Sequence, residues 1–145
     1  MDESEALSAL TAKEQAEAQM ARAAHCPLWR HAVFGLLMGG LVASPAFPLL
    51  IRTLLLVLIL ASIPIIINSD RKRMGMFING YRRGKTRVVV VGILIIELAL
   101  YGLSVYYGLV LNDHSTPLLL GFAGFLIGTL ASVVWQRIFV REMRA

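Results

Sequence analysis

Residues 88–111 read VVVVGILIIELALYGLSVYYGLVL, a run of 24 residues with one acidic side chain, Glu97, and no basic one. An α-helix of this length measures about 36 Å at 1.5 Å per residue, and the hydrocarbon core of a bilayer is about 30 Å thick. A barrel strand would need only about 10 residues and would alternate polar with apolar side chains. The run therefore predicts a transmembrane helix.

Three further apolar runs accompany this one, at residues 31–47, 49–67 and 118–139. The first of them is close to the lower length limit for a helical span. The chain is 57% hydrophobic with a mean hydropathy of +0.70, whereas soluble domains are about 45–50% apolar. We therefore expect an all-α membrane protein with a four-transmembrane-helix bundle in residues 29–145.

Residues 1–28 are rich in alanine and acidic side chains, and they predict a short cytoplasmic helix over residues 2–24. Within it, Thr11 followed by Glu14 has the spacing of a capping box, in which the Thr11 hydroxyl accepts from the backbone N–H of Glu14 and the Glu14 carboxylate reaches back. This segment is an alanine-rich amphipathic arm in front of the membrane domain.

The distribution of basic residues predicts the orientation. Of the 14 Lys and Arg residues, 13 lie before the first apolar run, in the loop 68–87, or at and beyond the end of the last run, and the other is Arg52. Cytoplasmic segments carry the excess of Lys and Arg in membrane proteins. We therefore expect both termini and the loop to be cytoplasmic in a multi-pass protein of the bacterial inner membrane.

Glu97 is the main candidate for a functional residue because it lies near the middle of its run. A charged carboxylate at the bilayer centre costs at least about 2.5–3.5 kcal/mol, and such residues usually face the bundle interior or a water-filled pocket. Tyr101 and Ser104 follow at i+4 and i+7, on the same helix face. The three residues form a candidate proton or cation site; alternatively, a protonated Glu97 hydrogen-bonds a neighbouring helix.

Small residues at four-residue spacing mark helix-packing faces in the first and last runs. They are Gly35 and Gly39 in the first run, and Gly124, Gly128 and Ser132 in the last. Such residues let helix backbones approach closely in lipid. The sequence leaves open whether these faces meet within one chain or between chains. The other polar residues of the last run, Thr129 and Gln136, are expected to make ordinary interhelical hydrogen bonds.

The loop 68–87 is strongly basic. A cluster of basic residues beside a span is typical of contact with anionic lipid headgroups, although topology alone also explains such charge. Gly84-Lys85-Thr86 resembles the end of a phosphate-binding loop, but that motif requires glycine at position 79, which is Asn79. Nucleic-acid binding is not expected, since no recognised fold accompanies the charge. The candidate lipid contacts are Arg71, Lys72, Arg73, Arg82, Arg83, Lys85 and Arg87.

The sequence contains no catalytic or metal-binding motif that fixes a reaction. Its one cysteine, Cys26, cannot form an intrachain disulfide. We expect no cofactor and no enzymatic activity. The leading expectation is an accessory, assembly or scaffold subunit that acts through helix packing and the basic loop, as a homo-oligomer or within a larger membrane complex. The alternative is a small proton- or cation-coupled transporter or channel that uses Glu97.

Overall fold

The structure is a computed structural model, and it describes residues 3–23, 27–74 and 85–144. Within these ranges it contains helices and short connections and no strand, as the sequence predicts. The five α-helices are α1 (Glu3–Ala23), α2 (Leu28–Ala43), α3 (Leu49–Met74), α4 (Lys85–Val105) and α5 (Ser115–Arg144). A 3-10 turn, η1 (Ser44–Ala46), follows α2, and a π-helical turn, η2 (Tyr106–Val110), closes α4.

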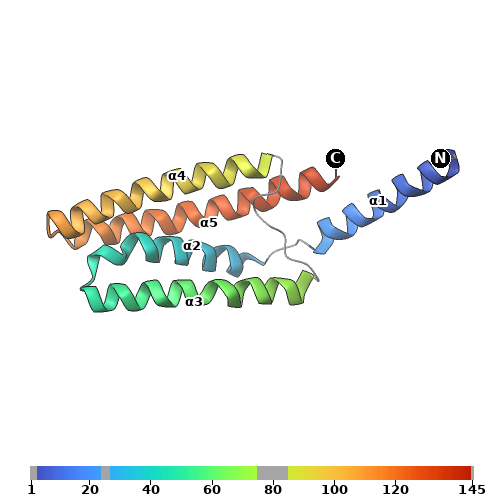
Figure 1. Ribbon diagram of the computed structural model, residues 1–145. Helices are drawn as coiled ribbons and strands as arrows, with labels where there is room; N and C mark the ends of the chain where they lie inside the picture. The colour runs from blue at the N-terminus through green and yellow to red at the C-terminus, as the bar shows by residue number, and fades with distance from the viewer. Residues whose placement is uncertain (1–2, 24–26, 75–84, 145) are drawn as a thin grey trace.

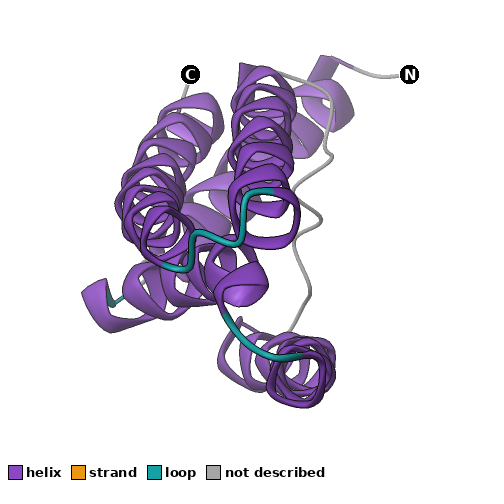
Figure 2. Cartoon of the chain, turned by 90° about the vertical axis from the view of Figure 1, so that its left-hand side faces the viewer, coloured by secondary structure: helices purple, strands orange, loops and turns teal. Residues whose placement is uncertain are grey.

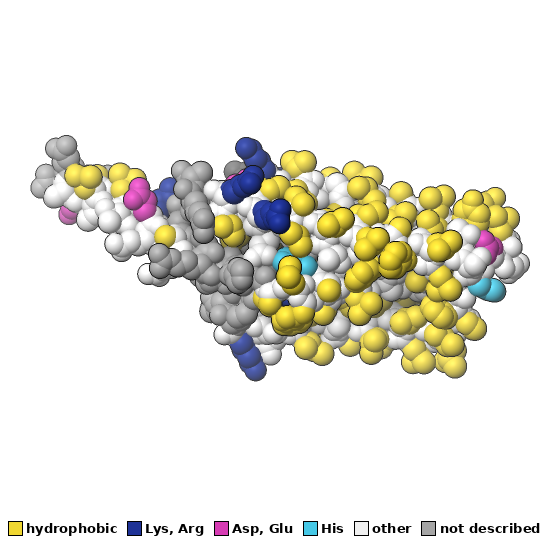
Figure 3. Space-filling view, turned by 180° about the vertical axis from the view of Figure 1, so that it is seen from behind, with side chains coloured by type: hydrophobic (Ala, Val, Ile, Leu, Met, Phe, Trp, Pro, Cys, Tyr) yellow, Lys and Arg dark blue, Asp and Glu magenta, His cyan; other side chains and the backbone are white. Residues whose placement is uncertain are grey.

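Three helical segments are long and apolar enough to cross a membrane: Leu49–Lys72 in α3, Lys85–Val110 in α4 with η2, and Ser115–Glu142 in α5. The chain is therefore a multi-pass membrane protein. Figure 3 shows hydrophobic side chains over much of one face of the bundle, with Lys and Arg gathered toward the end next to α1.

The helix at the predicted first span is shorter than the other three. α2 has 16 residues, or about 24 Å of helix. It begins directly after Pro27 and ends where Pro45 follows Ser44. Pro45 has no N–H group to continue the helical hydrogen-bond pattern, so the regular α-helix ends and the chain passes into the 3-10 turn η1.

Helices α2 to α5 lie side by side, and α1 extends from one end of them (Figure 1). α5 contacts both α2 and α4, whereas α3 contacts mainly α2 and η1. Figure 2 shows α3 at the edge of the group. α1 joins the bundle, and α5 ends, on the side where α3 finishes and α4 starts (Figure 1). We call this the basic end.

Polar contacts connect the helices at the basic end. Arg30, near the start of α2, forms an ion pair with the buried Asp70, near the end of α3. The backbone N–H of Lys85, at the start of α4, donates to Glu142 Oε1 of α5 at 2.6 Å. A carboxylate is favourable there because the first N–H groups of a helix lack intrahelical partners and carry partial positive charge.

The turn between η2 and α5 closes the opposite end of the bundle. Asn112 adopts a left-handed conformation with φ of 54°, which asparagine tolerates better than most residues. Asp113 Oδ1 then accepts from the backbone N–H groups of Ser115 at 2.9 Å and Thr116 at 3.4 Å. The hydroxyl groups of Ser115 and Thr116 also donate to this carboxylate. These hydrogen bonds, the Ser115 hydroxyl first, hold the pKa of Asp113 well below its ordinary value.

The predicted capping box at Thr11 is wrong. α1 begins at Glu3, and the hydroxyl of Thr11 donates at 2.9 Å to the carbonyl of Leu7 one turn earlier in the same helix. A threonine inside a helix commonly bonds to the i−4 carbonyl in this way. The helix itself matches the predicted segment.

Candidate functional site

The candidate site is built where glycines let α2 and α5 approach backbone to backbone. A Cβ atom added to Gly35 would lie 2.5 Å from the carbonyl oxygen of Phe125. A Cβ atom added to Gly39 would lie 2.5 Å from the carbonyl oxygen of Gly121. Neither position has room for even one methyl group, so this contact requires both glycines.

Glycines of α5 face the same contact from the other side. A Cβ atom on Gly128 would lie 3.2 Å from the Cα atom of Gly35, and one on Gly124 would lie 3.4 Å from Cγ2 of Val42. The small-residue faces of the two helices therefore pack against each other within a single chain. Close backbone approach of this kind is a main source of helix association in lipid.

Glu97 packs against this contact from α4. Its side chain is buried, with 7% exposed, and its Oε2 atom lies 3.1 Å from the position that a Cβ atom on Gly124 would take. Neither carboxyl oxygen has a hydrogen-bond partner among the described residues. A charged carboxylate is costly in such surroundings. Charging Glu97 therefore requires an incoming cation, water, or a rearrangement of the neighbouring helices.

Ser104, predicted on the same face as Glu97, is fully buried and has a defined role. Its hydroxyl donates to the carbonyl oxygen of Val42, in the last turn of α2. The final carbonyls of a helix have no intrahelical N–H partner, so Ser104 satisfies one of them from α4. Tyr101, between Glu97 and Ser104, is partly exposed.

A histidine that the sequence analysis did not select joins α2 to α5. His31 is 4% exposed. Its Nδ1 atom lies 2.8 Å from the hydroxyl of Ser132, and its Nε2 atom lies 2.6 Å from Oε1 of Gln136. With the amide oxygen accepting from Nε2–H, a neutral imidazole accepts the Ser132 hydroxyl proton at Nδ1, and an imidazolium would donate to both oxygens. Both ring nitrogens are therefore paired.

These groups form one row of polar side chains, which we call the polar seam: His31, Ser132, Gln136, Glu97 and Ser104. His31, Glu97 and Ser104 are buried, and Ser132 and Gln136 are partly buried. Glu97 lies beside Gly124 and His31 beside Ser132, eight residues further along α5. At 1.5 Å per residue the two ionisable side chains are separated by about 12 Å along the helix axis. Glu97 and Ser104 thus lie in one seam with Ser132. Thr129 is not part of this seam, because its hydroxyl donates to the carbonyl of Phe125 in its own helix at 2.8 Å.

The sequence contains a spacing pattern that could have identified His31 as a site residue. His31 precedes Gly35 by four residues, and Gln136 follows Ser132 by four, so each continues the small-residue stripe of its helix. If α2 and α5 are known to pack antiparallel, continuing each stripe by one further step of four residues places His31 opposite Ser132 and Gln136. The sequence alone did not provide that pairing.

The candidate lipid contacts are only partly described. Arg71, Lys72, Lys85 and Arg87 are exposed at the basic end. Arg73 belongs to the last turn of α3, and Arg82, Arg83 and Cys26 lie outside the described residues. In the described part of the chain, no group of three or more His, Cys, Asp or Glu side chains is placed to hold a metal ion.

Comparison with known proteins gives no match: no family model, no curated protein and no solved structure matches this chain significantly. Its function has to be inferred from the chemistry of the polar seam and of the helix surfaces.

Proposed function

We propose that the chain crosses the inner membrane four times, with α2 as a short first crossing and the basic end in the cytoplasm. An even number of crossings is supported because the chain enters the bundle from α1 and leaves it at the end of α5 on the same side, the basic end (Figure 1). The orientation is supported by the distribution of Lys and Arg: in this topology 13 of the 14 fall on the cytoplasmic side, and the other, Arg52, lies near the outer end of α3.

Cysteine labelling of intact cells tests this topology, because Cys26 is the only native cysteine. In a Cys26→Ser background, His114→Cys should react with a membrane-impermeant maleimide from outside. Lys72→Cys should react only after permeabilisation. Both positions are exposed, so burial does not explain a failure to react. Labelling of Lys72→Cys in intact cells would overturn the orientation.

Within this topology, the proposed function is transfer of protons or a small cation across the membrane, with Glu97 as the group that binds the ion. The observation that carries the proposal is the burial of both Glu97 carboxyl oxygens without a hydrogen-bond partner among the described residues. Ionisable residues within a span usually mark an ion or proton pathway. The same seam contains the imidazole of His31, whose two ring nitrogens are hydrogen-bonded to Ser132 and Gln136 of α5.

Flux into liposomes tests the role of Glu97. The purified protein is reconstituted with a pH-sensitive dye inside the vesicles, and uptake is followed after a pH step or a gradient of Na⁺ or K⁺. Glu97→Gln keeps the size of the side chain and removes its charge, so it should reduce flux to that of empty vesicles. Glu14→Gln makes the same change on exposed α1 and should leave flux unchanged. Equal flux in wild type and Glu97→Gln would exclude this function.

The second candidate is a non-enzymatic accessory or assembly subunit, either as a homo-oligomer or in a larger complex with anionic lipid at its cytoplasmic face. The glycine faces of α2 and α5 are already occupied within the chain. Association would therefore use other helix surfaces, and we propose α3, whose exposed apolar side chains include Leu50, Leu54 and Leu58.

Cross-linking tests association through α3. Leu58→Cys in the Cys26→Ser background should form a disulfide-linked dimer in membranes if α3 meets a second copy, and Leu130→Cys on the exposed face of α5 is the matched control. A monomer in nanodiscs, with neither variant cross-linking and no protein co-purifying, would exclude the assembly function.

A further inference from the structure

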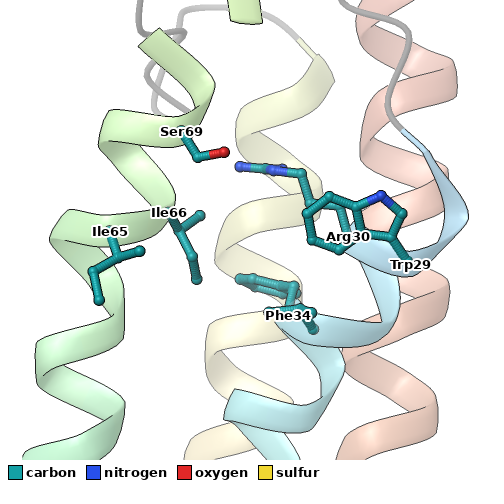
Figure 4. A pocket seen from close by; sticks show the side chains of 7 residues that line it. Trp29, Arg30, Phe34, Ile65, Ile66 and Ser69 are labelled. Atoms are coloured by element: carbon teal, nitrogen blue, oxygen red, sulfur yellow. The ribbon is translucent and has the colours of Figure 1, made fainter. Parts of the chain in front are cut away.

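A groove separates α2 from α3 near the basic end, and its volume is about 180 Å³. Its walls come from the first turns of α2 and the later turns of α3, as Figure 4 shows. The lining residues are Trp29, Arg30, Val33, Phe34, Ile65, Ile66 and Ser69. Neither helix fills this space, because α3 packs on α2 over only part of its length.

The groove changes in chemistry along its length. Val33, Phe34, Ile65 and Ile66 provide an apolar inner part, which lies toward the middle of the bundle. Arg30, Ser69 and the exposed indole of Trp29 lie at the end nearest the basic end. This order, apolar inside and polar at the interface, matches the order of groups in a phospholipid. Indole rings also favour the headgroup level of a membrane.

The size of the groove limits what it holds. Pockets that bury a whole drug-sized molecule are about 300–1,000 Å³. A groove of about 180 Å³ takes only a part of a larger molecule. One stretch of an acyl chain fits this requirement, with the rest of the lipid in the surrounding bilayer.

The charges at the mouth of the groove favour an anion. Arg30 is paired with Asp70, so these two charges balance. Lys72 is exposed and lies at i+3 from Ser69 and i+7 from Ile65, on the same face of α3. The ammonium of Lys72 therefore adds positive charge one turn beyond the Ser69 hydroxyl.

We propose that the groove between α2 and α3 is a binding site for one anionic phospholipid. Its acyl chain lies along Val33, Phe34 and Ile66, and its phosphate accepts hydrogen bonds from the Ser69 hydroxyl and the Lys72 ammonium. The site is separate from the polar seam, so it does not depend on ion transfer by Glu97.

Fluorescence quenching tests binding because Trp29 lines the groove. In a Trp135→Phe background, Trp29 is the only tryptophan. The protein is placed in zwitterionic vesicles that contain a minor fraction of phospholipid with brominated acyl chains. An anionic brominated lipid should quench Trp29 more than a zwitterionic brominated lipid at the same fraction, and unbrominated anionic lipid should reverse the difference. Equal quenching by the two lipids would overturn the proposal.

Two variants separate groove binding from simple attraction to the membrane surface. Lys72→Gln should weaken the apparent affinity for the anionic lipid about fivefold, and Arg141→Gln, exposed on α5, should not. Val33→Phe fills the apolar part and should abolish the preference, whereas Val57→Phe on the exposed side of α3 should not. If the anionic brominated lipid still quenched Trp29 more than the zwitterionic one in Val33→Phe, the headgroup would bind without the groove. That result would also overturn the proposal.

Discussion

α5 and α3 are both long apolar helices, yet only α5 is an organising element of the bundle. α5 contacts α2, α4, α1 and both short turns, whereas α3 contacts mainly α2 and η1. In the most apolar stretch of α3 no residue is buried, whereas 17% of the residues in the corresponding stretch of α5 are buried. α3 has isoleucine, leucine and valine on every side, while α5 presents Gly121, Gly124, Gly128 and Ser132 along one side.

This difference shows that apolarity and packing are separate properties in a membrane protein. Lipid tails solvate leucine as well as another helix does, so apolar side chains provide little drive for association. Small residues provide close van der Waals contact, and polar residues provide interhelical hydrogen bonds. α3 has the composition of a lipid-facing helix, and α5 has the composition of a packing helix.

The largest expected effect is at the glycine contact. Gly39→Ala places a methyl group against the backbone oxygen of Gly121 and should destabilise the bundle by about 1–3 kcal/mol. Gly102→Ala is the control, because a Cβ atom there meets nothing within 4 Å, and it should be neutral or slightly stabilising. Unfolding in mixed detergent micelles measures both. Equal stability of the two variants would contradict the close approach of α2 to α5.

A matched pair of valines compares the two regions directly. Val42 is 1% exposed in the α2 core, and Val57 is 58% exposed on α3. Val42→Ala should cost about 1 kcal/mol through the packing contacts it loses, while Val57→Ala should change stability by less than about 0.5 kcal/mol. If Val57→Ala lowered the stability measured by detergent unfolding by more than this, α3 would be packed against a partner.

A double-mutant cycle measures the hydrogen bond that joins α2 to α5. His31→Ala and Ser132→Ala should show a coupling of about 0.6 kcal/mol, typical of interhelical hydrogen bonds in membranes. His114→Ala with Ser132→Ala is the control pair, because His114 lies in the turn at the other end of α5, and its coupling should be zero. A zero value for the His31 pair would show that His31 and Ser132 do not interact.

The smallest expected effect is a pH dependence at the turn before α5. The pKa of Asp113 is lowered in the folded state, and the ordinary value in an unfolded chain is about 3.9. Its charge therefore stabilises the fold above about pH 4, and this contribution is lost as the pH falls toward the native pKa. The unfolding midpoint of wild type should exceed that of Asp113→Asn near neutral pH, and the difference should shrink on acidification. A difference that does not depend on pH would exclude the charge as its cause.

The sequence predicted the helices well because hydropathy reports which segments partition into lipid. It did less well at helix ends: α3 continues to Met74, seven residues past the predicted limit at residue 67. The continuation is polar and pairs Asp70 with Arg30, and hydropathy does not report such contacts. The predicted span 31–47 overlaps α2, but Pro45 replaces its end with a 3-10 turn.

The candidate site was only partly predictable. The spacing of Glu97 and Ser104 on one helix face follows from periodicity within one segment. The bonds of His31 to Ser132 and Gln136 join residues more than 100 positions apart, and single-segment periodicity carries no information about which helices are neighbours. For the same reason, the sequence could not show whether the glycine faces of α2 and α5 meet within one chain or between chains.

The order of the helices along the chain has a consequence for biogenesis. α2 is the shortest of the four bundle helices and the first of them to be synthesised, but its main contact partner, α5, is the last. Until α5 emerges, the imidazole of His31 lacks Ser132 and Gln136 and the glycine face of α2 is uncovered. The newly made hairpin of α2 and α3 therefore lacks most of the contacts of α2 until α5 has been synthesised.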